Sequence, residues 1–161
     1  MIPIERISLF LYLVSLALWL GGAFMLSFVV APKTLQSMPS RGRAGTLITQ
    51  FLKTFDIWKI FFILELTAFT LVRDVNDVLP KPTPAEIATI FFLVLSWAGN
   101  HMVLAPRMDE LRLAIGYFDS APPDAPERKS FARLHGLAMF LTIGDFTGGL
   151  FLLFFLVVRW P

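Results

Sequence analysis

A long uncharged segment near the N-terminus constrains the fold of this chain more than any other feature. Residues 7–31 contain no charged side chain, and about 20 apolar residues suffice for a helix to cross the ~30 Å hydrocarbon core of a bilayer. The segment is too long for the apolar region of a signal peptide, and Val30-Ala31-Pro32-Lys33 makes a poor cleavage site. We therefore expect an uncleaved membrane-spanning helix.

Three further segments have the length and composition of membrane spans, at residues 57–72, 87–105 and 134–158. Hydrophobic residues make up 56% of the chain and charged residues only 16%, whereas a soluble domain carries about 25% charged residues. The mean hydropathy is +0.69. The sequence therefore predicts an all-α fold, an integral membrane four-helix bundle, as a single membrane domain over residues 1–161 without an internal repeat.

Composition also excludes several classes of function. The net charge is only +2, so nucleic acid is not expected as a partner. The chain has no cysteine, which excludes zinc and iron–sulfur sites built on thiolates. No Ser-His-Asp arrangement, phosphate-binding loop or HExxH motif occurs in the sequence. We therefore expect a protein that is not an enzyme and has no catalytic residues and no metal site.

Two of the predicted helices continue beyond the bilayer as amphipathic extensions. Residues 45–56 precede the second span and residues 107–118 follow the third, each with apolar side chains at helical spacing. The segment 119–126 is rich in proline and cannot be helical. Both extensions are expected on the same side of the membrane.

The distribution of cations predicts the orientation. The loops at residues 32–56 and 107–133 hold nine Lys and Arg residues, against four in the termini and the remaining loop. Because cations favour the cytoplasmic side, we expect these two loops and their helical extensions in the cytoplasm. Both termini would then lie outside a cell (inner) membrane that the chain crosses several times.

Polar residues inside the spans indicate a common layer. At ~1.5 Å per residue, a depth of about 21 Å from the outer polar flanks reaches Leu20, Lys59, Asn100 and Asp145 on the four helices. Lys59 and Asp145 are natural partners, because pairing lets both remain charged. The pair either fixes the helix register or handles protons or small ions. Glu65 lies about 9 Å shallower without an obvious partner, as a neutral carboxyl or a proton carrier.

The two histidines raise the alternative of a haem b site, as in membrane cytochromes. By the same measure His101 lies about 22 Å deep and His135 about 36 Å deep. Paired ligation needs both imidazole rings at one level, so structural roles are favoured and no cofactor is expected. A haem held by one histidine and Met102 or Met139 is a weaker alternative.

Small residues indicate where the helices pack closely. Gly144 and Gly148 form a GxxxG pattern, and Ala17 with Gly21 a similar pair of small residues. His135 and Asp145 share one polar face of the last helix with three small or polar residues, and this face should point into the bundle. These three are Ala138, Thr142 and Gly149.

Several polar groups are expected to converge at the cytoplasmic end. Pro106 should end or kink the third helix, because it lacks an N–H and crowds the preceding turn. The freed carbonyl group would take a hydrogen bond from Asn100 or His135, near Arg107. Gly136 would let the last helix approach closely enough for this contact. The motif is thus predicted to join the two helices.

Three motifs carry a resemblance to a known family. Trp19-Leu20-Gly21-Gly22 with residues 28–32, residues 100–108 and residues 131–137 together resemble the transmembrane protein 205-like group. The family pattern maps onto Gly21, Gly22, Asn100, Pro106, Arg107, His135 and Gly136. The resemblance implies a four-helix membrane domain of unknown function, distantly similar to copper-resistance D and cytochrome-b-like membrane proteins.

These observations favour a non-enzymatic multi-pass membrane protein that acts as a structural or accessory subunit. Its expected partners are the lipid bilayer and either other membrane subunits or further copies of itself. The alternative from another class is a protein that binds haem or a metal ion, or handles protons or small ions.

Overall fold

The computed structural model describes residues 4–75 and 79–159 of the chain. In this part every regular element is helical, which confirms the all-α prediction. The elements in order are α1 (Ile4–Phe24), η1 (Met25–Val30), α2 (Ala31–Ser37), α3 (Arg41–Val75), α4 (Pro84–Ala98), η2 (Gly99–Leu104), α5 (Ala105–Ile115) and α6 (Pro126–Arg159).

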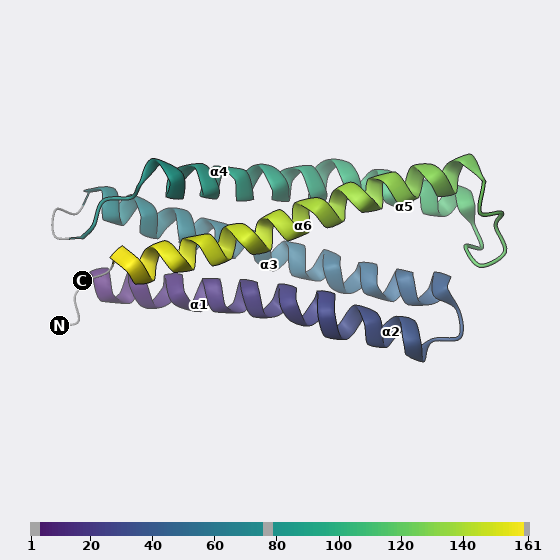
Figure 1. Ribbon diagram of the computed structural model, residues 1–161, viewed down its shortest axis with the longest axis horizontal. Helices are drawn as coiled ribbons and strands as arrows, with labels where there is room; N and C mark the ends of the chain where they lie inside the picture. Colours follow the sequence, from purple (N-terminus) through teal and green to yellow (C-terminus); the bar gives the residue numbers. More distant parts are fainter. Residues whose placement is uncertain (1–3, 76–78, 160–161) are drawn as a thin grey trace.

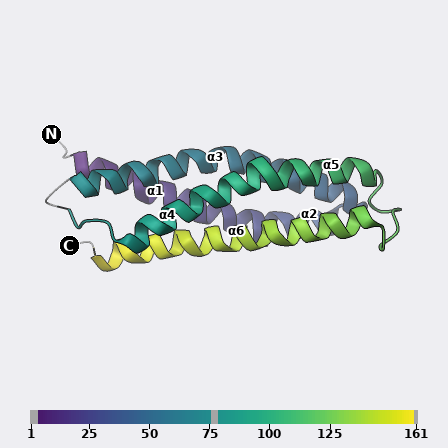
Figure 2. The ribbon, with the colours of Figure 1, turned by 90° about the horizontal axis from the view of Figure 1, so that it is seen from above.

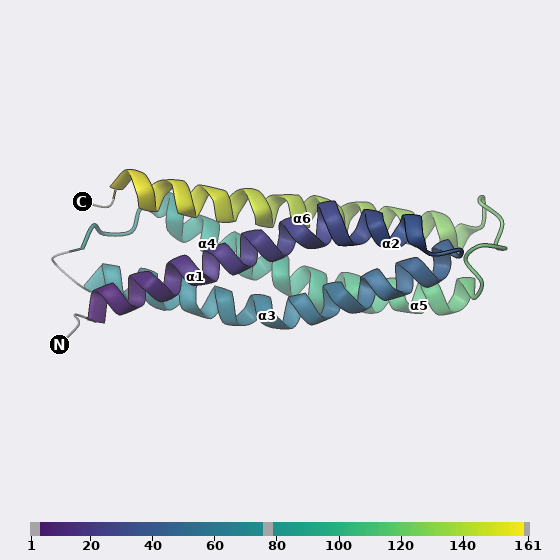
Figure 3. The same cartoon turned by 90° about the horizontal axis from the view of Figure 1, so that it is seen from below.

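Within the described residues these elements join into four long rods. The first is continuous over Ile4–Ser37, the second is α3, the third is continuous over Pro84–Ile115, and the fourth is α6. The rods lie side by side, and each runs antiparallel to the next along the chain (Figures 1, 2 and 3). The first rod contacts α3 and α6, and α4 contacts the same two helices from the other side. The start of α1 and the end of α6 therefore lie at one end of the molecule, and the 38–40 and 116–125 turns at the other.

Three of these rods are long and apolar enough to cross a membrane, judged by length and composition over the described residues. They are Ile4–Ser37, Pro84–Ile115 and Pro126–Arg159. The second rod, α3, does not meet the same criterion, because Lys59, Glu65 and Arg73 interrupt its apolar sequence. Length and composition therefore support three of the four expected membrane spans.

The rods are longer than the predicted spans. Helix α3 begins at Arg41 and includes residues 45–56, and the third rod runs on through α5. The predicted extension over residues 107–118 is too long, because α5 ends at Ile115 and Gly116 adopts a positive φ of 65°. A positive φ breaks the helix and suits glycine, which has no Cβ.

The prolines of the first and third rods neither end nor sharply divide their helices. Each follows a π-helical turn, in which the N–H of Ala31 donates to the carbonyl of Leu26, and that of Ala105 to the carbonyl of Asn100. The wider turn compensates for the backbone N–H that proline lacks, so the helix continues past the proline. Of the two predicted effects of Pro106, an end of the helix is not found, and the local distortion takes the form of the π-helical turn. The same turn precedes Ala-Pro and a cation in both rods, at residues 29–33 and 103–107, a local repeat that the sequence analysis missed.

The core is narrow, and it mixes apolar side chains with charged ones. Its apolar part comprises Tyr12, Leu16, Trp19, Ala23, Ile63, Leu66, Phe69, Ile90, Leu93, Leu152 and Leu156. The buried polar residues are Ser15, Lys59, Arg73, Glu86, Ser96, Asn100 and Asp145. The outer surface along the middle of the rods is apolar instead, with exposed aromatic rings such as Phe10, Phe61, Phe91, Phe140 and Phe154. Polarity is thus inverted relative to a soluble protein.

Some of the predicted packing glycines lie at helix contacts, and others do not. A Cβ on Gly144 would lie 2.8 Å from Phe92, and one on Gly148 would lie 3.2 Å from Leu93. Gly22 packs against Phe55, and Gly149, which the sequence had placed on the inward face, against Leu20. Open space surrounds both Gly21 and Gly136. The prediction that Gly136 brings two helices together is therefore wrong.

The glycine contacts predict a large difference between two equal substitutions in α6. Gly149→Val should lower the free energy of unfolding by about 1–3 kcal/mol, because even a Cβ would lie 2.9 Å from Leu20. Gly136→Val, the matched control, meets nothing within 4 Å and should leave stability nearly unchanged. Thermal unfolding in detergent measures both. Equal losses would show that Gly149 does not pack as described.

Candidate functional site

A buried group of charged side chains joins α3 to α6 in the middle of the bundle. Lys59 Nζ lies 3.3 Å from Asp145 Oδ2 and 3.1 Å from Asp56 Oδ1. Lys59 and Asp145 are almost completely buried. The Phe55 ring also faces the ammonium group, with its centroid 5.7 Å away. The structure therefore brings together the Lys59 and Asp145 pair that the sequence predicts, and adds a second carboxylate.

Helix α4 contributes a hydroxyl group beside this pair. Ser96 is buried and faces the Asp145 carboxylate. Its Oγ and Asp145 Oδ1 are both buried without a hydrogen-bond partner among the described residues, as is Trp19 Nε1. Buried polar atoms without partners are uncommon, since each costs about 1–3 kcal/mol. We call Asp56, Lys59, Ser96 and Asp145 together the ionic centre.

Asn100 and Glu65, which the sequence also placed inside the spans, do not belong to the ionic centre. Asn100 is buried one turn beyond Ser96, and its carbonyl accepts the hydrogen bond of the π-helical turn. Glu65 is half-buried and has no ion pair or hydrogen bond among the residues that the structure describes. Sequence reasoning missed Asp56 and Ser96. The spacing of Asp56 three residues before Lys59, on one helix face, was the signal available.

A second ionic group lies at the end where α1 begins and α6 ends. Glu86 accepts from Arg73 Nη1 at 2.6 Å and from Arg159 Nη1 at 3.1 Å. Arg73 Nε also donates to the carbonyl of Pro80 at 2.9 Å. Thr83 and Glu86 form a reciprocal capping box at the start of α4. This ionic clasp, Arg73–Glu86–Arg159, ties α3, α4 and α6 together, although the sequence analysis treated its members as separate flanking charges.

The histidines lie on the outer surface rather than in the bundle. His101 is exposed and stacks on Trp97 with 5.3 Å between ring centroids, while His135 is exposed and stacks on Phe131 at 6.1 Å. His135 therefore does not join the helix ends, and the predicted helix-joining motif is wrong. Pro106 and Arg107 are exposed as well. The described residues contain no group of three or more His, Asp or Glu side chains suited to a metal ion.

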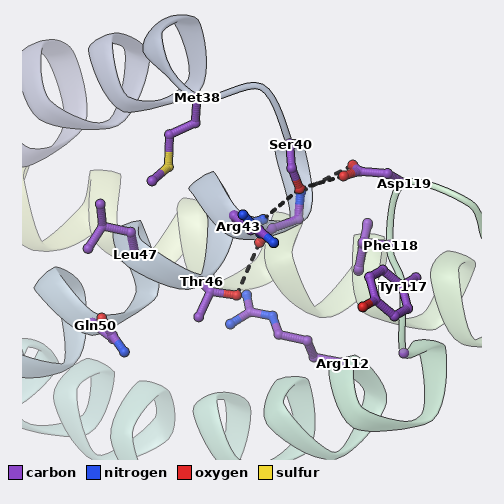
Figure 4. Close-up of a pocket in the computed structure, with 12 residues that line it drawn as sticks. Met38, Ser40, Arg43, Thr46, Leu47, Gln50, Arg112, Tyr117, Phe118 and Asp119 are labelled. Atoms are coloured by element: carbon purple, nitrogen blue, oxygen red, sulfur yellow. Dashed lines mark hydrogen bonds between the residues drawn. The ribbon is translucent and has the colours of Figure 1, made fainter.

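A cavity of about 390 Å³ opens at the end opposite the clasp, between the start of α3 and the 116–119 turn (Figure 4). Ser40 caps α3, since its Oγ accepts from the N–H of Arg43 at 3.1 Å. Ser40 Oγ also donates to Asp119 Oδ2 at 2.5 Å, and the N–H of Gly42 donates to Asp119 Oδ1 at 3.2 Å. Arg112 borders the cavity and donates to Thr49 at 2.9 Å. The sequence analysis gave no sign of this cavity.

Comparison with known proteins identifies the family. Residues 14–116 match the domain of unknown function DUF4149. The chain belongs to this family. The match extends from α1 to the end of α5, so it includes Asp56, Lys59 and Ser96, whereas Asp145 lies beyond it. No curated protein and no solved structure matches the chain, and the resemblance to the transmembrane protein 205-like group and to copper-resistance D gains no support.

The ionic centre of this DUF4149 protein predicts unequal effects for its two buried charges. Lys59→Leu should lower the free energy of unfolding by about 3–5 kcal/mol, because it strands Asp145 and Asp56 without a cation. Asp145→Leu should cost less, because Lys59 keeps Asp56 at 3.1 Å. The double variant, Lys59→Leu with Asp145→Leu, should recover part of the loss. Thermal unfolding of purified variants in detergent measures all three.

Lys53→Leu is the matched control on the same helix. Lys53 pairs with Asp109, and both side chains are well exposed to solvent, so this change should cost less than about 1 kcal/mol. If Lys59→Leu were no more harmful than Lys53→Leu, the ionic centre would not contribute to stability.

The contact between Ser40 and Asp119 predicts a pH dependence at the cavity. The hydrogen bond from Ser40 lowers the pKa of the Asp119 carboxyl below its ordinary value. Because the pKa is lowered, the ionised Asp119 carboxyl stabilises the contact at pH values above its ordinary pKa near 4. This contribution is lost as the pH falls through the lowered pKa. Exchange of the Gly42 amide hydrogen, corrected for its intrinsic rate, should therefore lose protection at low pH. In Asp119→Asn that loss should vanish, and protection that persisted in the native chain at low pH would contradict the contact.

Proposed function

We propose that this DUF4149 protein is an integral membrane protein in which all four rods cross the bilayer. The observation that carries the proposal is the inverted polarity of the molecule: apolar side chains cover the middle of its surface, while Lys59, Arg73, Glu86 and Asp145 are buried. In water such a surface would be exposed at a large cost in free energy. In a bilayer the same surface contacts lipid, and the charged groups are kept away from it.

Helix α3 is part of this proposal, although it is not apolar enough to be identified as a membrane span from composition. Its cations are turned inward, since Lys59 belongs to the ionic centre and Arg73 to the ionic clasp. The exposed side chains between these two residues are all apolar. They are Phe61, Leu64, Ala68 and Leu71. A helix with paired charges inside and apolar side chains outside is compatible with lipid.

The orientation follows from the cations at the two ends of the bundle. We propose that the loops at residues 32–56 and 107–133, including the helical segments 45–56 and 107–115, lie in the cytoplasm. The start of α1 and the end of α6 would then lie on the outer side of a cell (inner) membrane. In this arrangement the cavity faces the cytoplasm and the ionic clasp faces outward.

We further propose that the protein acts as a non-enzymatic structural or accessory subunit, without a bound cofactor. The small residues Ala17 and Gly21 are exposed on α1, where they allow the close approach of a helix from another subunit or a second copy. The exposed positions of His101 and His135, each stacked on an aromatic ring of its own helix, favour structural roles over haem ligation. Lipid and membrane proteins are the proposed partners.

Cysteine labelling tests whether α3 crosses the membrane. The chain has no cysteine, so Ser40→Cys and Val75→Cys each introduce a single thiol, one at each end of α3. In intact cells a membrane-impermeant maleimide should label position 75 from outside. Position 40 should react only after the membrane is opened, because the cation-rich loops are retained in the cytoplasm.

Ser120→Cys serves as a control at the same end as Ser40. It should behave like Ser40→Cys, since Ser120 directly follows Asp119, which accepts the hydrogen bond of Ser40 at the cavity. Labelling of positions 40 and 75 from the same side would rule out a spanning α3. Labelling of 40 from outside and of 75 only after opening would reverse the orientation and leave the four spans intact. Release of the protein from membranes by alkaline carbonate would overturn membrane insertion itself.

A further inference from the structure

The charged residues of α3 form a ladder that leads from the surface to the ionic centre. Lys53 pairs with Asp109 near the cavity end, Asp56 follows one turn later, and Lys59 one turn after that. The charges alternate in sign along α3, from Lys53 through Asp56 to Lys59, and the ladder ends at Asp145. Side-chain exposure falls steadily along it, from 47% for Lys53 and 37% for Asp109 to 17% for Asp56, 6% for Lys59 and 2% for Asp145.

The ionic centre carries more negative than positive charge. Lys59 provides one cation, whereas Asp56 and Asp145 provide two carboxylates, and these three are the charged groups that act on one another there. Ser96 from α4 cannot supply a compensating charge, and α1 places the apolar Leu20 against α6 at Gly149. An uncompensated charge in a low-dielectric interior costs several kcal/mol. Uptake of one proton removes this charge.

The two oxygen atoms without partners show where the proton can reside. Asp145 Oδ1 and Ser96 Oγ are both buried, and neither has a hydrogen-bond partner in the part of the chain that the structure describes. A protonated Asp145 can donate to the Ser96 oxygen, and a charged Asp145 can accept from the Ser96 hydroxyl. The same two atoms can therefore satisfy each other in either protonation state, so a proton can enter or leave without stranding a polar atom.

The path beyond the ionic centre is closed by apolar side chains. Leu66, Leu93 and Leu152 are almost completely buried, and they occupy the interval between the centre and the ionic clasp. The clasp itself is fully paired, with Arg73 and Arg159 on Glu86. Among the described residues the centre is therefore more open toward the cavity end, where the Asp56 side chain is 17% exposed.

From this arrangement we infer that the ionic centre is a proton-binding site, in which Asp145 takes up one proton that exchanges with water at the cavity end. The site takes its proton from hydronium or water and returns it by the same route, so it binds a proton without conducting it across the membrane. The inference rests on the proposed membrane setting, which keeps the interior dry.

Infrared difference spectroscopy of the full chain in lipid nanodiscs tests the inference. Spectra between alkaline and acidic buffer should show the carbonyl band of a protonated carboxyl in an apolar site, and this band should shift in D₂O. Asp145→Asn should abolish it. The matched control Asp124→Asn, at an exposed loop position, should retain it.

Two further variants separate proton binding from a structural role. Ser96→Ala removes only a hydroxyl group, so the fold should persist while the band shifts in frequency, because the protonated carboxyl loses its hydrogen-bond acceptor. Asp56→Leu should weaken or abolish the band, because Lys59 then balances Asp145 and no charge in the ionic centre remains uncompensated. Size-exclusion profiles confirm that each variant is folded.

A band lost in Asp145→Asn and shifted in Ser96→Ala supports the proton site. Identical difference spectra for the native chain and folded Asp145→Asn would overturn it and leave an ion pair that only fixes the helix register. Because this result says nothing of membrane insertion, which carbonate extraction and labelling report, failure of the proton site and failure of the proposed function are distinguishable.

Discussion

An apolar outer surface around a charged interior requires every buried charge to find its partner inside the molecule. Lys59 meets this requirement with Asp56 and Asp145, and Glu86 meets it with two arginines. Without such partners a helix with the charges of α3 could not be placed among apolar neighbours, because each unpaired charge would cost several kcal/mol. The arrangement of α3, α4 and α6 therefore depends on these two ionic groups, whereas the first rod packs on α3 and α6 through apolar side chains.

The charged part of the site was partly predictable because depth along a helix can be read from residue number. Equal rise per residue places Lys59 and Asp145 at one level, and the structure brings them to 3.3 Å. Depth does not give rotation about the helix axis, however. Ser96 was passed over although it lies one turn from Asn100, and the histidines were placed by depth alone although both face outward.

The helix-joining motif failed for a physical reason that applies beyond this chain. The interpretation assumed that a backbone carbonyl freed by Pro106 takes a hydrogen bond from a side chain, either Asn100 or His135. Instead the helix widens by one residue before the proline, and the change is absorbed within the same rod. The overall helical fold was predictable from long apolar segments, whereas this local adjustment depends on main-chain geometry that residue patterns do not encode.

The spacing of the two ionic groups explains how the rods keep their relative positions. Residues 59 and 73 on α3 have the same separation as residues 145 and 159 on α6, about 21 Å along each axis, and each pair of levels is joined by an ionic group. Sliding α6 past α3 by a turn would separate Asp145 from Lys59 and Arg159 from Glu86, and it would leave the buried Asp145 without a cation. Apolar contacts such as Leu66 and Leu152 could re-form after such a slip, since they are not directional. The ionic groups therefore fix the register of α6 relative to α3, and apolar side chains pack in the space between the two groups.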